Sequence, residues 1–272
     1  MTKYLFGEMT WPEVKEAVKD ERVAIVPVAM IEEHGYHLPV DTDVVLANEV
    51  CMRAAKKIPE QVVVVPTINH GYAPHQMDFP GVISISSKTF INYVVDVCNS
   101  LAHQGFKRII LLNGHGSNVS LLHVATRQVM LAYEDVMCVS LSHWDLQPVI
   151  DLVEKIRESE NPGGINHAGE LETSMYLAIN EDLVQMDKAV RDLDKYKMSK
   201  YFWLDLVGKG EGRIAHMMPY WSMISETGVL GDARPSTKEK GEKILQAAED
   251  GFVEFIEILK ARSLHSRENH HE

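Results

Sequence analysis

The chain has 272 residues, 45% of them hydrophobic, and 27 lysines and arginines against 39 aspartates and glutamates give a formal net charge of -12. This length and composition can bury a substantial core, and we expect a single domain over residues 1–272. The acidic balance gives no electrostatic support for binding nucleic acid or an anionic membrane. We therefore expect a small-molecule substrate, no nucleic-acid partner and no membrane partner.

The three cysteines, Cys51, Cys98 and Cys138, lie far apart and include no CxxC pair. They predict buried free thiols in a reducing compartment rather than a disulfide framework. Residues 1–14 lack a basic region followed by an apolar stretch, and no run approaches the roughly 20 apolar residues of a membrane span. A cytoplasmic location is the expectation.

Strands and helices alternate along the first half of the chain. The β-branched runs that predict strands buried on both faces are residues 22–30, 61–67, 107–113 and 135–141. The helix-length segments are residues 44–57, 88–104, 118–133, 145–158, 169–179 and 237–262. Because strand and helix alternate, the pattern predicts an α/β fold with a mainly parallel sheet covered by helices.

An irregular region at residues 196–234 contains aromatic residues, methionines, glycines and prolines. Long loops inside a compact domain are usually functional. For residues 201–223, two interpretations stay open, a lid over a site or a contact between subunits. The polar end at residues 263–272 predicts a frayed terminus rather than a metal site, although it contains histidines.

The first chemical motif, EEHGYHLPVDTD, directly follows the first predicted strand. Glu32 and His34 are two residues apart and so point to one side of an extended segment, and Asp41 and Asp43 repeat that spacing before a helix. Carboxylate and imidazole together suit zinc, manganese or iron, and one carboxylate can bridge two ions. A charged surface loop, or a helix cap at Thr42 or Asp43, remains the simpler alternative.

The second motif, NGHGSN, follows the third predicted strand and places His115 between two glycines at a strand-to-helix turn. Because parallel strands end at one edge of a sheet, both motifs are expected to face the same crevice. An anion loop for a nucleotide or sugar phosphate is an alternative. However, Val119 stands where the dinucleotide motif has its third glycine. A histidine that merely packs is also possible.

The third motif, NHAGELETS, places His167 just before a helix whose first turn carries Glu170, and Glu172 follows. An imidazole has an ordinary pKa near neutrality, so His167 suits proton transfer if it enters the crevice. An acidic side chain such as Glu170 commonly complements a helix dipole. The spacing leaves open which of the two glutamates faces the crevice.

Two further segments follow predicted strands and supply weaker candidates. His70 and His75 follow the second strand, where they could line the mouth of a pocket or be ordinary loop residues. Trp144 follows the fourth strand, where it could form a wall for the substrate or fill the core.

Taken together, the three motifs resemble the creatininase (creatinine amidohydrolase) family, through ExHGxHLPxxTD, NGHGxN and HAGxxETS. The segment GVLGDARPSTKEKGEKIL, residues 228–245, also resembles the closing loop and helix of that family. The resemblance implies a three-layer α/β sandwich, a hydrolase with two divalent metal ions (Zn, Mn or Fe), and commonly a homohexamer. A homo-oligomer is therefore expected.

Carried over residue by residue, the resemblance implies that Glu32 and His34 each ligate one ion, that Asp43 bridges both, and that His115 completes the first site. Creatininase itself has a glutamate two residues after that histidine, where this chain has Ser117. The resemblance then points to Glu172 as the last ligand of the second site. The residues implied in catalysis are His167, which matches the catalytic histidine of the family, and Glu172.

Residues around these ligands have supporting roles in this hypothesis. His37 and Asp41 are expected to orient the metal-bound imidazoles, because such imidazoles need hydrogen-bond partners on their other nitrogen. The residues expected to contact the substrate are Ser117, Trp144 and His75.

The leading hypothesis is hydrolysis of an amide-like C–N bond in a small cyclic substrate, by a hydroxide that bridges the metals, with His167 as acid and base. Members of the family differ, acting on creatinine, a formylated pyrimidine, a peptide or a keto-inositol. Hydrolytic C–C ring opening of a cyclic keto-sugar or keto-inositol is therefore the first alternative. A non-hydrolytic protein that binds an anion or nucleotide is the second.

Overall fold

The structure is a computed structural model. It describes the whole chain except residues 1, 200, 203, 208–215, 265–267, 269 and 272. The predicted lid or subunit contact at residues 201–223, and the predicted frayed terminus, therefore lie partly outside the described residues. Among the helices that are described, none combines the length and apolarity needed to cross a membrane. All three cysteines are free and buried, as the sequence predicts.

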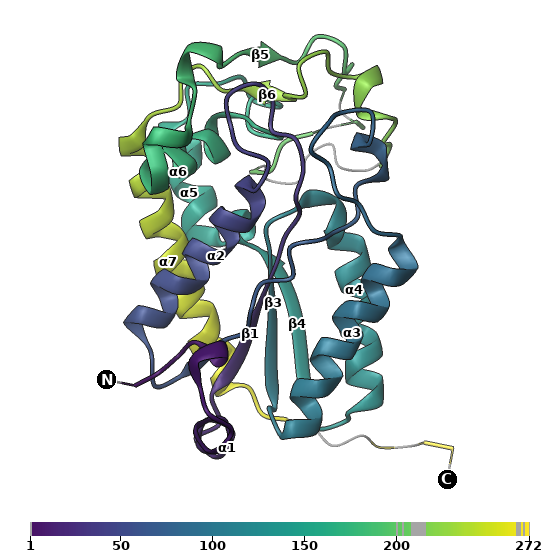
Figure 1. Ribbon diagram of the computed structural model, residues 1–272, viewed down its shortest axis with the longest axis vertical. Coiled ribbons are helices and arrows are strands. Elements are labelled where there is room, and N and C mark those ends of the chain that lie inside the picture. The colour runs from purple at the N-terminus through teal and green to yellow at the C-terminus, as the bar shows by residue number, and fades with distance from the viewer. Residues whose placement is uncertain are drawn as a thin grey trace.

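The centre of the fold is a parallel sheet of four strands (Figure 1). In sheet order the strands are β2 (Val62–Val64), β1 (Val23–Val28), β3 (Arg108–Asn113) and β4 (Met137–Ser142). β1 and β3 lie in the middle and are buried along their whole length. The predicted strand at 61–67 is shorter than expected, because Pro66 has no N–H to continue the ladder.

Helices pack on both faces of this sheet (Figure 1). The helices α2, α5, α6 and α7 cover one face, and α3 and α4 cover the other. The bounds are α1 (Trp11–Lys19), α2 (Thr42–Lys57), α3 (Ser87–Gln104), α4 (Val119–Ala132), α5 (Gln147–Ile156), α6 (Glu170–Asn180) and α7 (Lys238–Ala261). The predicted three-layer sandwich with a mainly parallel sheet is confirmed.

Alternation along the strands explains why two separate cores form. Val23 and Ile25 of β1 pack into the core beneath α2 and α7, whereas Ala24 and Val26 pack into the core beneath α3 and α4. Successive side chains of a strand point to opposite faces, so a strand that is apolar throughout must be covered on both sides.

One helix, α1, is absent from the sequence prediction although its signal is local. Thr10 and Glu13 form a capping box, in which the Thr10 N–H donates to Glu13 Oε2 at 2.7 Å. Pro12 stands in the first turn, where its missing N–H costs nothing. The capping box therefore accounts for a helix of only nine residues.

Above the carboxyl edge of the sheet lies a layer of loops with a short antiparallel pair, β5 (Arg191–Asp192) and β6 (Gly231–Asp232) (Figure 1). The main chain of His167 pairs with Leu230, the residue before β6, through hydrogen bonds of 2.9 and 3.0 Å. The third motif is thereby joined to the closing segment of the chain. All three motifs meet at this edge.

Candidate metal centre

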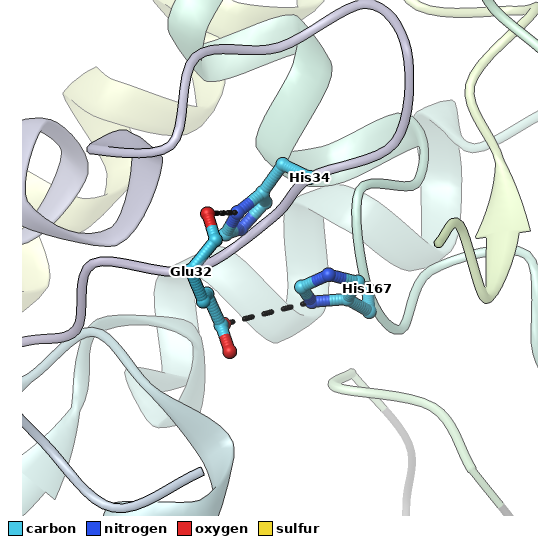
Figure 2. Close-up of side chains that lie close together, drawn as sticks. All are labelled: Glu32, His34 and His167. Carbon is cyan, nitrogen blue, oxygen red and sulfur yellow. Dashed lines mark hydrogen bonds and ion pairs between the residues drawn. The ribbon is translucent and has the colours of Figure 1, made fainter. Parts of the chain in front are cut away.

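The loop after β1 carries the first motif. Gly35 has φ +66, and a Cβ at this position would collide with the Val229 side chain, so the turn requires glycine. The turn leaves Glu32 and His34 almost fully buried, with 1% and 0% of their surface exposed. Their side chains lie close to His167, which comes from the third motif (Figure 2).

Asp43 lies in the first turn of α2, but it does not cap the helix. The N-cap position belongs to Asp41, which makes no capping bond, and the Thr42 hydroxyl donates to the Pro39 carbonyl at 2.7 Å. Asp43 Oδ1 is 3.2 Å from His34 Nε2, and Asp43 Oδ2 is 3.2 Å from His115 Nδ1. One buried carboxylate thus faces two imidazoles through different oxygens, and the cap interpretation is wrong.

His115 is held by the turn that follows β3. The Asn113 side chain accepts from the His115 N–H at 3.2 Å and donates to the His115 carbonyl at 2.8 Å. A Cβ on Gly114 would lie 2.7 Å from the Asp43 carbonyl oxygen, so the turn packs directly against α2. His115 Nδ1 is also 2.9 Å from Glu32 Oε1. The two motifs therefore meet through side chains as well as through the backbone.

Of the two glutamates on α6, Glu172 faces the cluster. Its Oε2 accepts the Ala168 N–H at 2.6 Å and lies 3.9 Å from His34 Nε2. Ala168 has φ +52, a conformation that a residue other than glycine rarely adopts. This strained turn fixes the Glu172 carboxylate beside His34 of the first motif.

Glu170 points away from the cluster and has a structural role. It accepts main-chain N–H groups of Glu158 and Ser159, the latter at 2.8 Å, and pairs with Lys240 of α7 at 2.6 Å. These bonds join α6 to the segment after α5 and to α7. The ambiguity between the two glutamates is thereby resolved in favour of Glu172.

Three buried groups of side chains could each hold a metal ion, because one ligand atom from each member lies within 4.8 Å of the others. Two of the groups share Asp43 and together use all five predicted ligands. The groups are Glu32, Asp43 and His115; His34, Asp43 and Glu172; and Glu32, His34 and His167.

The residues present fit divalent ions. Around a tetrahedral zinc ion with bonds of about 2.0–2.1 Å, neighbouring ligand atoms lie roughly 3.3 Å apart, close to the 3.2 Å that separates Asp43 from each imidazole. Three of these buried atoms, Glu32 Oε2, His34 Nε2 and Asp43 Oδ2, have no hydrogen-bond partner. Buried polar atoms are normally paired, so these three atoms are available as ligands for a cation.

The electrostatics of the cluster also favour cations. Burial by itself lowers the pKa of His34, but Asp43, Glu172 and Glu32 outweigh it and raise that pKa to about 10. In the same way, burial by itself lowers the pKa of His115, but the carboxylates of Glu32 and Asp43 outweigh it and raise that pKa well above its usual value. The negative potential that holds protons on these imidazoles equally attracts metal ions, which would replace the protons.

In His34 and His115, the ring nitrogen that does not face Asp43 lies near a main-chain carbonyl. His34 Nδ1 lies 3.3 Å from the carbonyl of Glu32, and His115 Nε2 lies 3.3 Å from that of Tyr72. Such contacts leave the other nitrogen of each ring free to face a metal. The expected orienting partners, His37 and Asp41, are not the ones that the structure shows.

His37 and Asp41 instead connect the loop to α6. His37 Nε2 lies 2.8 Å from the Thr173 hydroxyl, and Asp41 Oδ1 accepts from the Tyr176 hydroxyl at 3.2 Å. The carbonyl of Glu32, two residues before His34 in the same loop, already occupies the position beside Nδ1 that these side chains were expected to take.

The cluster borders a cavity of about 90 Å³, which adjoins a larger one of about 680 Å³. The predicted substrate residues Ser117, Trp144 and His75 line both cavities, and His75 Nε2 lies 3.3 Å from Ser117 Oγ. Burial, with the neighbouring imidazoles, lowers the pKa of His75 to about 4, so this ring is neutral at neutral pH. His70 lines neither cavity.

His167 lines the smaller cavity, and its two nitrogens have different surroundings. Nε2 lies 2.8 Å from the Glu33 carbonyl, and Nδ1 lies 3.7 Å from Glu32 Oε1 (Figure 2). Since a carbonyl only accepts, Nε2 carries the hydrogen and Nδ1 is the nitrogen toward Glu32. The ring packs 4.3 Å from His34 and edge-on to Trp221 at 5.2 Å.

Two residues near the centre are absent from the sequence-based candidates. Glu33 is buried beside His167, but alternation along the loop predicts only that it points away from Glu32. Trp221 contacts both His167 and His75, but it lies in the irregular region, where no periodic pattern marks it.

A buried cluster of carboxylates and imidazoles at the carboxyl edge of a parallel sheet defines this chain as an α/β protein with a candidate two-ion centre. The family model described as "Creatininase: Creatinine amidohydrolase" matches residues 7–256. The chain belongs to the creatininase family.

Relatives of known activity include creatinine amidohydrolase of Pseudomonas putida, 31% identical over 94% of this chain and 97% of the relative. The mycofactocin precursor peptide peptidase of Mycolicibacterium smegmatis is 28% identical, over 86% and 84%. The 3-dehydro-scyllo-inosose hydrolase of Thermotoga maritima is 27% identical, over 96% and 85%. The family is therefore one of hydrolases with several substrates.

Solved structures agree with this assignment. Creatinine amidohydrolase (creatininase) superposes with a TM-score of 0.81 at 27% identity, covering 97% of this chain and all of that one. A mutant creatininase in a Zn-Zn form gives 0.79 at 28% identity, and a manganese form gives 0.76 at 29%; each covers 96% of this chain and all of the other. Creatininases thus exist with zinc and with manganese.

Proposed function

We propose that this protein is a metal-dependent hydrolase that cleaves an amide-like C–N bond in a small cyclic substrate. The observation that carries the proposal is the Asp43 carboxylate, which faces His34 through one oxygen and His115 through the other. A carboxylate in this position suits two adjacent ions. The relatives that hydrolyse C–N bonds support the same conclusion.

In this proposal, Glu32, Asp43 and His115 hold one ion, and His34, Asp43 and Glu172 hold the other. When bound, a pair of divalent ions supplies a nucleophilic water and polarises a carbonyl. The oxygen of water adds to the carbonyl carbon, the C–N bond breaks, and the leaving nitrogen needs a proton. His167 Nδ1 faces Glu32 at the cavity and is placed to move that proton.

Hydrolytic C–C ring opening of a cyclic keto-sugar or keto-inositol is the second candidate, because the same water and carbonyl serve it. The larger cavity favours a hydroxylated ring, since hydroxyls and a neutral imidazole line it. A relative that hydrolyses an inosose supports this candidate. A phosphate-binding role is disfavoured, because the Glu32 carboxylate lies 2.9 Å from His115, where it would repel an anion.

Metal removal is the test of the proposed function. We expect the freshly purified, tag-free protein to carry about two divalent ions per chain and to lose them, with all hydrolytic activity, on chelation. The chelated protein should also unfold at a temperature several degrees lower, because bound ions stabilise the folded state and the buried carboxylates lose their counter-ions. Elemental analysis measures the metal content and thermal unfolding measures the stability, and neither measurement needs a substrate.

Addition of manganese or zinc is expected to restore the unfolding temperature, whereas magnesium at the same concentration serves as the control. With metal restored, cyclic amides and cyclic ketones can be compared as substrates. A protein that binds neither manganese nor zinc would contradict the proposal.

Replacing Ser117 with alanine tests the substrate pocket. The hydroxyl faces His75 where the two cavities meet, so Ser117→Ala is expected to raise KM about tenfold, the cost of roughly one hydrogen bond, and to leave metal content and kcat unchanged. Steady-state kinetics on the substrate found above provide the measurement. The matched control is Ser100→Ala, which removes an exposed hydroxyl of α3 that donates to the Asp96 carbonyl. An unchanged KM in Ser117→Ala would remove Ser117 from the binding site.

A further inference from the structure

Glu33 is a buried carboxylate that the proposed reaction does not use. Only 6% of its surface is exposed, and it lines neither cavity. Its Oε2 accepts the Gly35 N–H at 2.9 Å, and its Oε1 lies 3.3 Å from His167 Nε2 without making a hydrogen bond. Glu33 therefore lies behind His167, on the side away from the substrate.

His167 is the basic side chain beside this carboxylate. Among the residues that the structure describes, no lysine or arginine lies within ion-pair distance of Glu33, and its close contact with a basic group is the one to His167 Nε2. A buried carboxylate is costly unless a charge or hydrogen bonds compensate it. The imidazole is therefore the basic partner of the Glu33 carboxylate, in addition to the hydrogen bond from the Gly35 N–H.

A glycine on another segment encloses the same carboxylate. Gly228 has φ +87, and a Cβ there would collide with Glu33 Oε2. The Gly228 carbonyl accepts the indole N–H of Trp221 at 2.7 Å, which fixes the loop in place. The Glu33 carboxylate is therefore confined by its own loop on one side and by the Gly228 loop on another.

We propose that Glu33 is a positioning residue for His167. Its main-chain carbonyl, at 2.8 Å, and its carboxylate, at 3.3 Å, both face Nε2, so the ring keeps its hydrogen there and presents Nδ1 to the cavity. This inference rests on the proposed role of His167 in proton transfer and deepens it. Nδ1, rather than Nε2, is then the nitrogen that exchanges a proton with the substrate.

The first experiment needs no substrate. Full-length protein labelled with ¹⁵N-histidine and loaded with zinc is examined by NMR, and the His167 signals are assigned by their loss in His167→Gln. We expect the hydrogen on Nε2 in the wild type. In Glu33→Ala only the main-chain carbonyl still faces Nε2, so the preference for Nε2 should weaken and a measurable population with the hydrogen on Nδ1 should appear. A hydrogen on Nδ1 in the wild type, or identical signals in both proteins, would overturn the proposal.

The second experiment is kinetic, with creatinine as the first probe and other cyclic amides after it. Glu33→Gln and Glu33→Ala are expected to lower kcat by about 10- to 100-fold, the usual effect of losing a partner that orients a ring, with KM and zinc content unchanged. A merely structural role would instead lower the zinc content or raise KM. The control is Glu49→Gln, which removes a carboxylate from the surface of α2, where it pairs with Arg53.

A double-mutant cycle separates the carboxylate from the loop that encloses it. Gly228→Ala is expected to lower kcat in the wild type, because the added methyl group displaces the Glu33 carboxylate. In the Glu33→Ala background it should change kcat less than about threefold, since coupled effects do not add. Fully additive effects would contradict the proposal. If the wild type hydrolyses no probe, the proposed function fails, while the NMR result still decides the assignment of Glu33.

Discussion

Replacing Asp43 with alanine is expected to reduce the metal content from about two ions per chain to less than one and to abolish hydrolysis. The reason is geometric, because each candidate ion needs one of the two Asp43 oxygens, which lie 3.2 Å from His34 and from His115. Removing one carboxylate therefore disrupts both groups of ligands at once. Elemental analysis of the purified variant is the measurement.

The matched control for this variant is Asp41→Ala. Asp41 lies two residues earlier in the same loop, but its carboxylate accepts from Tyr176 rather than facing the cluster. We expect Asp41→Ala to keep both ions. Two ions retained in Asp43→Ala would show that Asp43 is not a bridging ligand, and equal losses in both variants would point to a general disturbance of the loop.

Replacing His167 with alanine is expected to leave the metal content unchanged and to lower turnover about 10²- to 10⁴-fold, the range for a residue that transfers protons. His167 lines the cavity with its Nδ1 3.7 Å from Glu32, so it can reach a substrate held at the cluster. Single-turnover kinetics and elemental analysis on the same preparation are both required.

Metal content decides between two roles for His167, because Glu32, His34 and His167 also form a group that could hold an ion. Loss of one ion in His167→Ala would make His167 a ligand and leave the proton transfer to another residue. His103→Ala, on the exposed face of α3, controls for the loss of an imidazole as such.

The fold was largely predictable because its strands are apolar on both faces. A run such as residues 107–113 can be buried only between two layers of helices, and β3 lies in the middle of the sheet as that argument requires. Local sequence features account for two places where the observed elements differ from the predicted ones. Pro66 shortens β2, and α1 is a nine-residue helix that begins at a capping box of Thr10 with Glu13, a local signal that the prediction of long helices did not use.

The motifs and their spacing predicted which residues form the candidate centre. They did not predict which other side chains these residues contact. The partners that Glu170 finds away from the cluster include Lys240, which lies 70 residues later in the chain. The partner of Glu33 is His167, 134 residues away. Such contacts depend on how helices and loops pack in three dimensions, which periodicity along one segment does not describe.

The two candidate groups of ligands that share Asp43 come from four segments spread between residues 32 and 172. Two of these segments follow β1 and β3, which pair with each other in the sheet. A nascent chain that has not yet reached Glu172 has an incomplete second group, whatever metal surrounds it. For the proposed metal centre, this order of synthesis predicts that loading comes late in biogenesis, after the strands of the sheet have been made. Since divalent ions compete for such sites according to their supply, we expect the metal that a cell offers at that moment to select the form of the protein that accumulates.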